Sequence, residues 1–230
     1  MNPLTRLYSS SIGLKLVMAL TGAFMTFFIL VHMVGNLESF GGQEALNHYA
    51  TLLRTLPPAL WAFRALLAFA AVLHIVAGLR LWVLNRQARP VGYAKQTMQE
   101  TTLIARTMIY SGLFIAAFVT YHLLHFTFRT VDTSFQHMLD KHGRHDVYGM
   151  VENAFSSRGQ AAFYFVMMLL LGLHVSHGVE SMLHTLGINH PRYNPAIRWL
   201  GPLVAVLIVL GFVSVPFAIL AGLLQPAGGM

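Results

Sequence analysis

Five long apolar segments limit what this chain can fold into more than any other feature of its sequence. A helix that crosses the hydrocarbon core of a bilayer, about 30 Å thick, needs about 20 consecutive and mostly apolar residues. Segments of this kind lie near residues 14–35, 60–84, 104–128, 161–184 and 200–224. The sequence therefore predicts an all-α fold, an integral membrane bundle of five transmembrane helices.

The composition agrees with a membrane location. Hydrophobic residues make up 56% of the chain and charged residues 10%, and the mean hydropathy is +0.60, which is outside the range of an ordinary soluble domain. No polar stretch is long enough to form a separate soluble domain, so we expect residues 1–230 to form a single transmembrane domain. The first segment is not followed by a small-residue cleavage pattern, and we expect it to remain in the mature protein.

Several function classes are excluded or disfavoured by composition. The chain has no cysteine, so it contains no disulfide, no thiolate-bound iron–sulfur cluster, no covalently attached c-type haem and no cysteine nucleophile. The formal net charge is +7, but the cations flank the apolar segments and form no stripe on a soluble face. We therefore interpret them as membrane-topology signals and expect no nucleic-acid partner.

The connections between the segments carry ordinary turn and helix-end signals. The third connection, residues 129–160, is the longest and is rich in charged residues (Asp132, Asp140, Lys141, Arg144, Asp146 and Glu152), so we expect it to form a surface cap with some helix. The other breaks are marked by Gly41-Gly42, Pro57-Pro58, Arg89-Pro90, His190-Pro191 and Asn194-Pro195.

The distribution of Lys and Arg predicts the orientation in the membrane. The side that holds the N-terminus is richer in these residues, so we expect a cytoplasmic N-terminus and a cationic cytoplasmic face that binds anionic lipid or a soluble partner. That side contains Arg6, Lys15, Arg80, Arg86, Arg89, Lys95, Arg106, Arg192 and Arg198, and the opposite side contains Arg54, Arg64, Arg129, Lys141, Arg144 and Arg158.

Histidines lie well inside four of the five apolar segments. An ionisable residue at such depth is costly and by default marks a function. One isolated histidine is equally well explained by a hydrogen bond to a neighbouring helix, but the same feature in four segments is harder to explain in this way. The residues are His32 in the first segment, His74 in the second, His122 and His125 in the third, and His174 and His177 in the fourth.

The depths of these histidines match in pairs. Each lies past the middle of its helix and successive helices run in opposite directions, so depth pairs His32 with His122 or His125, and His74 with His174 or His177. Two imidazoles on facing helices suit the axial ligation of a haem iron in a helical bundle. The sequence therefore predicts two b-type haems, at depths that differ by about half of the core thickness.

Other residues near the histidines fit this prediction less specifically. Gly35, Gly78 and Gly178 would leave room for a flat macrocycle, although glycine is common in transmembrane helix contacts. Arg80 could reach a haem propionate or extend to lipid headgroups. Glu180 could conduct protons or could simply be hydrated near the interface.

The order and spacing of several stretches resemble a known family. The stretches are "SSSIGLKLVMALTGAFMTFFILVHMVGNLESFGG", "EALNHYATLLRTLP", "LHIVAGLRLW", "FVTYHLLHF" and "GLHVSHGVESM", which together extend over nearly all of the chain. They resemble the di-haem cytochrome b membrane-anchor subunit of bacterial succinate dehydrogenase and fumarate reductase, of the single-anchor, five-helix type. The third connection is longer here than in that family's pattern.

The resemblance implies one axial haem ligand on each of the first four helices. The matching positions are His32, His74, His122 and His174. The family pattern pairs His74 with His174 at the haem proximal to the iron–sulfur partner and His32 with His122 at the distal haem. It thereby sets aside His125 and His177, which depth alone leaves open.

The resemblance also implies the function and the partners. We expect the quinone-reactive anchor of a succinate:quinone oxidoreductase, in a bacterial cytoplasmic membrane, with a flavoprotein and an iron–sulfur subunit as partners and quinone, expected to be menaquinone, as substrate. The chain has no flavin or dinucleotide glycine fingerprint and no cluster cysteines, so dicarboxylate chemistry would take place on those partners. The direction of turnover and a higher oligomer of the complex are left open.

Other functions are compatible with the same pattern. A cytochrome b anchor of a hydrogenase or formate dehydrogenase would also bind haem but would associate with a different soluble module. A haem-free transporter or pH-responsive membrane protein would use the histidines as protonatable groups. A purely structural anchor would bind the soluble enzyme without haem.

Overall fold

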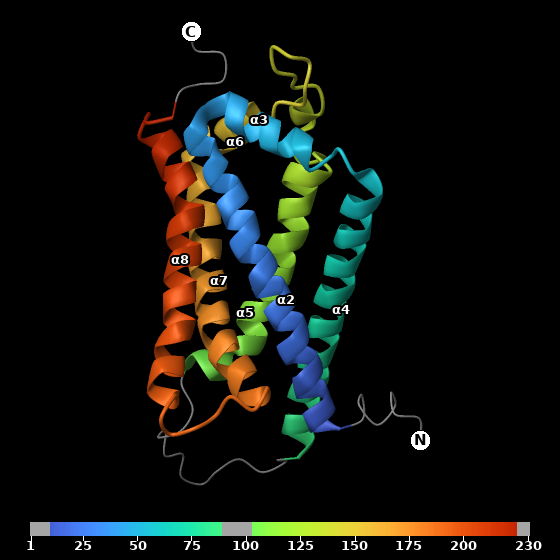
Figure 1. Cartoon of the computed structure of the whole chain (residues 1–230), viewed down its shortest axis with the longest axis vertical. Coiled ribbons are helices and arrows are strands. Elements are labelled where there is room, and N and C mark those ends of the chain that lie inside the picture. The colour runs from blue at the N-terminus through green and yellow to red at the C-terminus, as the bar shows by residue number, and fades with distance from the viewer. Residues whose placement is uncertain (1–9, 89–102, 225–230) are drawn as a thin grey trace. The chain divides into compact units, whose positions relative to one another are not determined.

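The structure is a computed structural model that describes residues 10–88 and 103–224. Figure 1 shows the helices labelled along the chain, and no strand occurs in this part of it. The long helices are α2 (Ser11–Leu37), α4 (Pro57–Gln87), α5 (Leu103–His122), α7 (Arg158–Thr185) and α8 (Asn194–Leu220). The shorter ones are η1 (Glu38–Gly41), α3 (Gly42–Leu52), η2 (Leu123–Thr127), η3 (Thr133–Gln136) and α6 (Val147–Ser156).

Five helical stretches are long and apolar enough to cross a membrane. Large apolar side chains lie outward on these helices: Phe27 is 64% exposed, Trp199 76% and Leu210 63%. Polar side chains such as Ser39 and Asn47 are instead fully buried. Apolar residues outside and polar residues inside are the pattern of a multi-pass membrane protein, because lipid solvates the first kind and not the second.

The helical stretches agree in extent with four of the five predicted segments and correct the fifth. Segments 14–35, 60–84 and 161–184 lie wholly inside α2, α4 and α7. The fifth segment was placed too late, because α8 begins at Asn194, with Pro195 in its first turn, where a proline N–H is not needed. The same helix ends at Leu220, where Gly222 adopts a φ of +68° and the Leu223 N–H donates to the Ala218 carbonyl.

The third predicted segment, 104–128, is not a continuous α-helix. α5 ends at His122, and the next five residues, Leu123–Thr127, form a π-helix. The wider turn is closed by the Phe128 N–H, which donates to the Leu123 carbonyl at 2.8 Å. Single π turns within α-helices are rare and are frequent at functional sites.

The predicted breaks lie at helix ends wherever the structure describes them. Pro57-Pro58 begins α4, and Gly41-Gly42 separates η1 from α3. The Arg89-Pro90 break lies outside the described residues, as do Arg6, Arg89 and Lys95 of the charge count. Helix α3 was not predicted from the sequence, which marked only breaks at Gly41-Gly42 and Pro57-Pro58 in this connection.

The described chain divides into two compact units, each of which draws on several helices. The first unit consists of Met1–Phe28, Arg64–Leu113 and Gly172–Ala205, and the second of Ile29–Phe63, Phe114–Leu171 and Val206–Met230. Each of the five long helices therefore begins in one unit and continues in the other, and α4 changes unit near its start, at Arg64.

In the first unit, α2 packs against α4 in antiparallel register. Leu14 and Ala77 are fully buried against each other and against Leu81. Further along α2, Met18 lies beside Gly78. As the residue number rises on α2 it falls on α4, and this register places Thr21 and Gly22 opposite His74.

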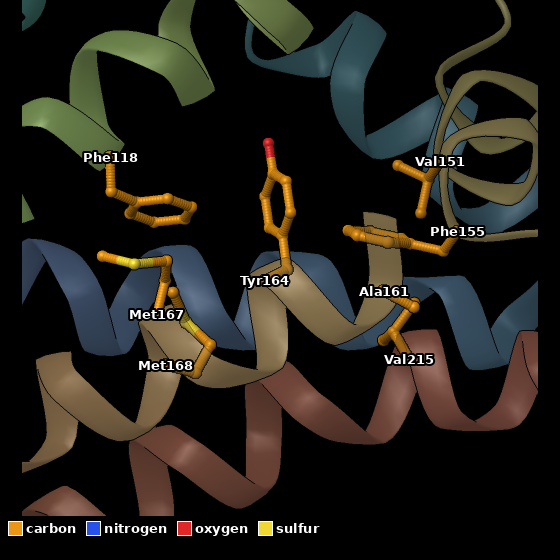
Figure 2. Packing of buried hydrophobic residues seen from close by; sticks show 8 residues of the cluster. All are labelled: Phe118, Val151, Phe155, Ala161, Tyr164, Met167, Met168 and Val215. Carbon is orange, nitrogen blue, oxygen red and sulfur yellow. The ribbon is translucent and has the colours of Figure 1, made fainter. Parts of the chain in front are cut away.

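In the second unit, a hydrophobic cluster centres on Tyr164 of α7. Figure 2 shows the Tyr164 ring between Phe118 on one side and Phe155 on the other, with its hydroxyl pointing away from the helix that bears it. Met168 and Val215 complete the packing between α7 and α8. The Phe118 and Phe155 rings each lie 5.1 Å from the Tyr164 ring in edge-on contacts, a favourable geometry for aromatic pairs.

A buried polar network joins α3 to the third connection within the second unit. The Asn47 amide nitrogen donates to Asp140 at 3.1 Å and to Asp146 at 2.9 Å, and its oxygen accepts from the Tyr148 N–H at 3.0 Å. The side chain of Asn47 is therefore fully satisfied, as a buried amide must be. The connection 129–160, expected as a surface cap with some helix, contains η3 and α6 and is joined to α3 by these bonds.

Arg144 extends this network to the surface. Its Nε donates to the Asp140 carboxylate at 2.8 Å, while its other two nitrogens contact Glu44 at 3.0 and 2.8 Å. Burial by itself would raise the pKa of Asp140, but the hydrogen bonds from Arg144 and Asn47 outweigh it and lower the pKa to about 2. Asp140 is therefore held as a carboxylate at neutral pH.

Candidate functional site

The first unit brings together two of the predicted histidines, one from each of two helices. The rings of His74 on α4 and His174 on α7 have centres 6.5 Å apart, with planes at 62°. These are the two residues that the family resemblance pairs at the proximal haem.

Each ring of this pair is held by a hydroxyl from a different helix. Thr21 Oγ1 on α2 lies 3.1 Å from His74 Nδ1. Ser111 Oγ on α5 lies 3.0 Å from His174 Nδ1. In both rings Nδ1 is therefore engaged, and Nε2 is the nitrogen that the hydroxyl leaves available.

A glycine follows each of these hydroxyl residues and packs against the same ring. A Cβ atom added to Gly22 would lie 3.3 Å from Cε1 of His74, and one added to Gly112 would lie 3.4 Å from Cε1 of His174. The four residues thus form two equivalent cradles, Thr21-Gly22 for His74 and Ser111-Gly112 for His174. The sequence analysis did not identify them, although both are hydroxyl–glycine dipeptides within apolar segments.

The second unit brings together the other predicted pair. The rings of His32 on α2 and His122 at the end of α5 have centres 6.0 Å apart, with planes at 76°. Phe212 of α8 lies against His32 with ring centres 5.7 Å apart. Nδ1 of His122 is buried and has no hydrogen-bond partner among the described residues, so this ring lacks the hydroxyl contact that each ring of the first pair has.

His125 is directed to other contacts. It lies in the π-helix, where its Nδ1 is 3.0 Å from the Tyr164 hydroxyl and its ring stacks on Phe135 at 5.6 Å. The ring beside His32 is that of His122, and the ring beside His74 is that of His174 rather than His177. His122 and His125, which depth left open as partners of His32, therefore have different neighbours: His122 lies beside His32 and His125 beside Tyr164.

The remaining sequence candidates lie apart from the ring pairs. A Cβ added to Gly35 would meet Tyr49 and one added to Gly78 would meet Met18, whereas one added to Gly178 would meet nothing within 4 Å, so the open space that a macrocycle needs is found beside Gly178 and not beside Gly35. Arg80 lines a shallow depression on α4 with Leu79, Val83 and Leu84, and its contact with a propionate stays a prediction. Glu180 is half-buried on α7.

The two ring pairs have the spacing that a shared metal requires. With a bond of about 2 Å between a first-row metal and an imidazole nitrogen, and about 1 Å more to the ring centre, two rings on opposite sides of one metal have centres about 6 Å apart. The observed 6.0 and 6.5 Å agree with this spacing. Neutral imidazole is also a usual axial ligand of haem iron, so the residues present fit the predicted group.

Two further observations concern the ring nitrogens of these pairs. Nδ1 of His122 is buried without a hydrogen-bond partner among the described residues, which costs about 1–3 kcal/mol, so the second pair departs from the first at this atom. The engaged Nδ1 atoms of His74 and His174 match the usual arrangement of metal-bound histidine, in which the second ring nitrogen is hydrogen-bonded.

No match was found when the chain was compared with protein-family models, with curated proteins and with solved structures. The functional interpretation therefore depends on the histidine geometry and on the stretches quoted from the sequence.

Proposed function

We propose that this protein is the membrane-anchor cytochrome b subunit of a succinate:quinone oxidoreductase. In this function it passes electrons between an iron–sulfur subunit and membrane quinone through two bis-histidine haems. The single observation that supports this most is the presence of two histidine ring pairs, 6.5 Å apart in the first unit and 6.0 Å apart in the second.

Each pair would hold one b-type haem. His74 and His174 would ligate the proximal haem iron, and His32 and His122 the distal one. A haem bound in this way takes up and releases one electron at a time. The protein's own contributions are to supply the imidazoles, to orient their rings with Thr21 and Ser111, and to exclude water with apolar neighbours such as Phe212.

The remaining parts of the reaction belong to partners. The chain has no cysteine for iron–sulfur clusters, so oxidation of succinate or reduction of fumarate would take place on a flavoprotein and an iron–sulfur subunit. These would dock on the cationic face that holds the N-terminus, which we propose is the cytoplasmic face of a bacterial inner membrane. The electron acceptor or donor within the membrane would be a quinone, proposed to be menaquinone.

The test of this proposal is a redox-difference spectrum of the detergent-purified protein, with haem quantified as the pyridine haemochrome. We expect two b-type haems per chain. A preparation made with adequate haem supply that contains none would overturn the proposal. The histidine pairs would then be edge-on aromatic contacts, for which centres 4.5–7 Å apart are also usual, as in a haem-free transporter.

The identity of the partner needs a separate measurement. Purification of the complex from gently solubilised membranes should yield a flavoprotein with succinate dehydrogenase or fumarate reductase activity. Co-purification with a hydrogenase or formate dehydrogenase would instead identify that enzyme as the partner and would leave the haem assignment unchanged.

A further inference from the structure

The hydroxyls of Thr21 and Ser111 use their own protons within their own helices. Thr21 Oγ1 donates to the Val17 carbonyl at 2.6 Å, and Ser111 Oγ donates to the Met108 carbonyl at 3.0 Å. A hydroxyl has one proton and two lone pairs. Since each proton already has an acceptor, the contact with the histidine is one in which the hydroxyl oxygen accepts.

The protonated nitrogen of each ring follows from this assignment. If Thr21 and Ser111 accept, then His74 and His174 each donate from Nδ1–H at 3.1 and 3.0 Å. A neutral imidazole protonated on Nδ1 has its free lone pair on Nε2. This is the tautomer that binds a metal through Nε2, and it is fixed on both rings by the same kind of contact.

We propose that Thr21 and Ser111 are positioning residues that set the tautomer of His74 and His174 and thereby tune the reduction potential of the haem held between them. This inference rests on the proposed function. A hydrogen bond from Nδ1–H to an acceptor makes the imidazole a stronger ligand base. A stronger base favours the ferric over the ferrous iron, so the two hydroxyls lower the potential of this haem.

The second histidine pair provides the contrast within one chain. Nδ1 of His122 has no hydrogen-bond partner among the described residues. This ring therefore lacks a hydroxyl acceptor of the kind that faces Nδ1 of His74 and of His174. We expect this contrast to give the haem at His74 and His174 the lower reduction potential of the two.

The test is a potentiometric titration of both haems in the full chain carrying Thr21→Val, Ser111→Ala or both. Valine keeps the shape of threonine and removes the acceptor. We expect the ferric-to-ferrous ratio of one haem at a given potential to fall several-fold in each single variant and up to about tenfold in the double variant, which equals an upward shift of about 59 mV for a one-electron couple. The other haem should not change.

Thr120→Val is the matched control. Thr120 lies on α5, like Ser111, and its hydroxyl donates to the Ala116 carbonyl at 2.9 Å, but it is exposed and contacts no histidine. It should leave both potentials unchanged. Thr21→Ser keeps the hydroxyl acceptor and should have the wild-type reduction potential. This variant distinguishes the effect of the hydrogen bond from the effect of lost packing.

Each possible result of the titration and of the haem quantification either supports or overturns the inference. Unchanged potentials in the double variant with full haem content would overturn the inference and leave the proposed function intact. A wild-type protein without haem would overturn both. Loss of one haem in Thr21→Val or Ser111→Ala, with retention in Thr21→Ser and Thr120→Val, would support the inference through haem affinity, since removal of such a partner typically weakens metal binding about 10–100-fold.

Discussion

The Nδ1 atom of His125 lies 3.0 Å from the hydroxyl oxygen of Tyr164, and both side chains are more than nine-tenths buried. Each group is the hydrogen-bond partner of the other inside an aromatic cluster, next to but separate from the pair formed by His32 and His122. The contact gives Nδ1 of His125 a hydrogen-bond partner within the protein.

We predict that Tyr164→Phe destabilises the protein and keeps both haems. The phenyl ring preserves the contacts with Phe118 and Phe155, while His125 loses its partner in a buried site, which costs about 1–3 kcal/mol. Thermal or denaturant unfolding in detergent measures the loss. Tyr193→Phe, at a side chain that is 55% exposed, is the control and should change little. Loss of a haem from Tyr164→Phe would indicate that the His125 contact supports the haem site itself.

We predict that an alanine variant of either histidine in a pair removes the one haem that the pair would hold. His74→Ala or His174→Ala should abolish the haem of the first unit, and His32→Ala or His122→Ala that of the second, because each iron would lose one of two axial ligands. The pyridine haemochrome should then report one haem per chain. His177→Ala is the control for His174→Ala and should retain two. A haem lost from His177→Ala would contradict the pairing.

We predict that Gly22→Ala lowers haem content at the His74 pair. Alanine normally favours a helix over glycine by about 1 kcal/mol, but the new methyl group would lie 3.3 Å from Cε1 of His74, so the ring must shift. Gly159→Ala on α7 is the matched control, since an added Cβ there meets nothing within 4 Å. Equal haem content in the two variants would show that close packing at Gly22 does not position the ring.

We predict that acid destabilises the cap formed by α3 and the third connection. The pKa of Asp140 is lowered from its ordinary 3.8 to about 2. A carboxylate whose folded-state pKa is lowered stabilises the fold above the unfolded value, and this stabilisation is lost as the pH falls through the folded value. Stability should therefore decline between pH 3.8 and about 2.

The matched variant for this prediction is Asp140→Asn. It removes the titrating group and leaves Arg144 with Glu44 alone, so the protein should be less stable at neutral pH and less sensitive to acid. Unfolding of wild type and variant across this pH range provides the measurement. An identical acid profile in both proteins would assign the acid sensitivity to other groups.

The sequence predicted the long helices well because hydropathy reports burial in lipid directly. It placed the last helix too late because Asn194 and Pro195 are usual in turns but here begin α8. It missed the π turn after His122 because that turn depends on a hydrogen bond from the Phe128 N–H to the Leu123 carbonyl. Helix α3 was missed for a related reason. The polar residues that make it look like a loop, such as Asn47, are buried against partners about 90 to 100 residues further on.

The candidate site was predictable in its histidines and not in its supporting residues. Depth along alternating helices restricts which histidines can meet, but it does not distinguish His122 from His125, which are three residues apart and separated in role by the π turn. Thr21 and Ser111 are ordinary residues for a membrane helix, because a hydroxyl can donate to a backbone carbonyl of its own helix. Only the packing of α2 on α4 and of α5 on α7 reveals that their oxygens face imidazole nitrogens.

The division of the histidine pairs between two units has a consequence for synthesis. Both residues of the second unit's pair, His32 and His122, are synthesised before α7 begins at Arg158, whereas His74 must wait for His174, about fifty residues later than His122. At about 5–20 residues per second, that interval lasts several seconds. The order of residues along the chain therefore fixes the order in which the two ring pairs can form, and the pair cradled by Thr21 and Ser111 is the later of the two.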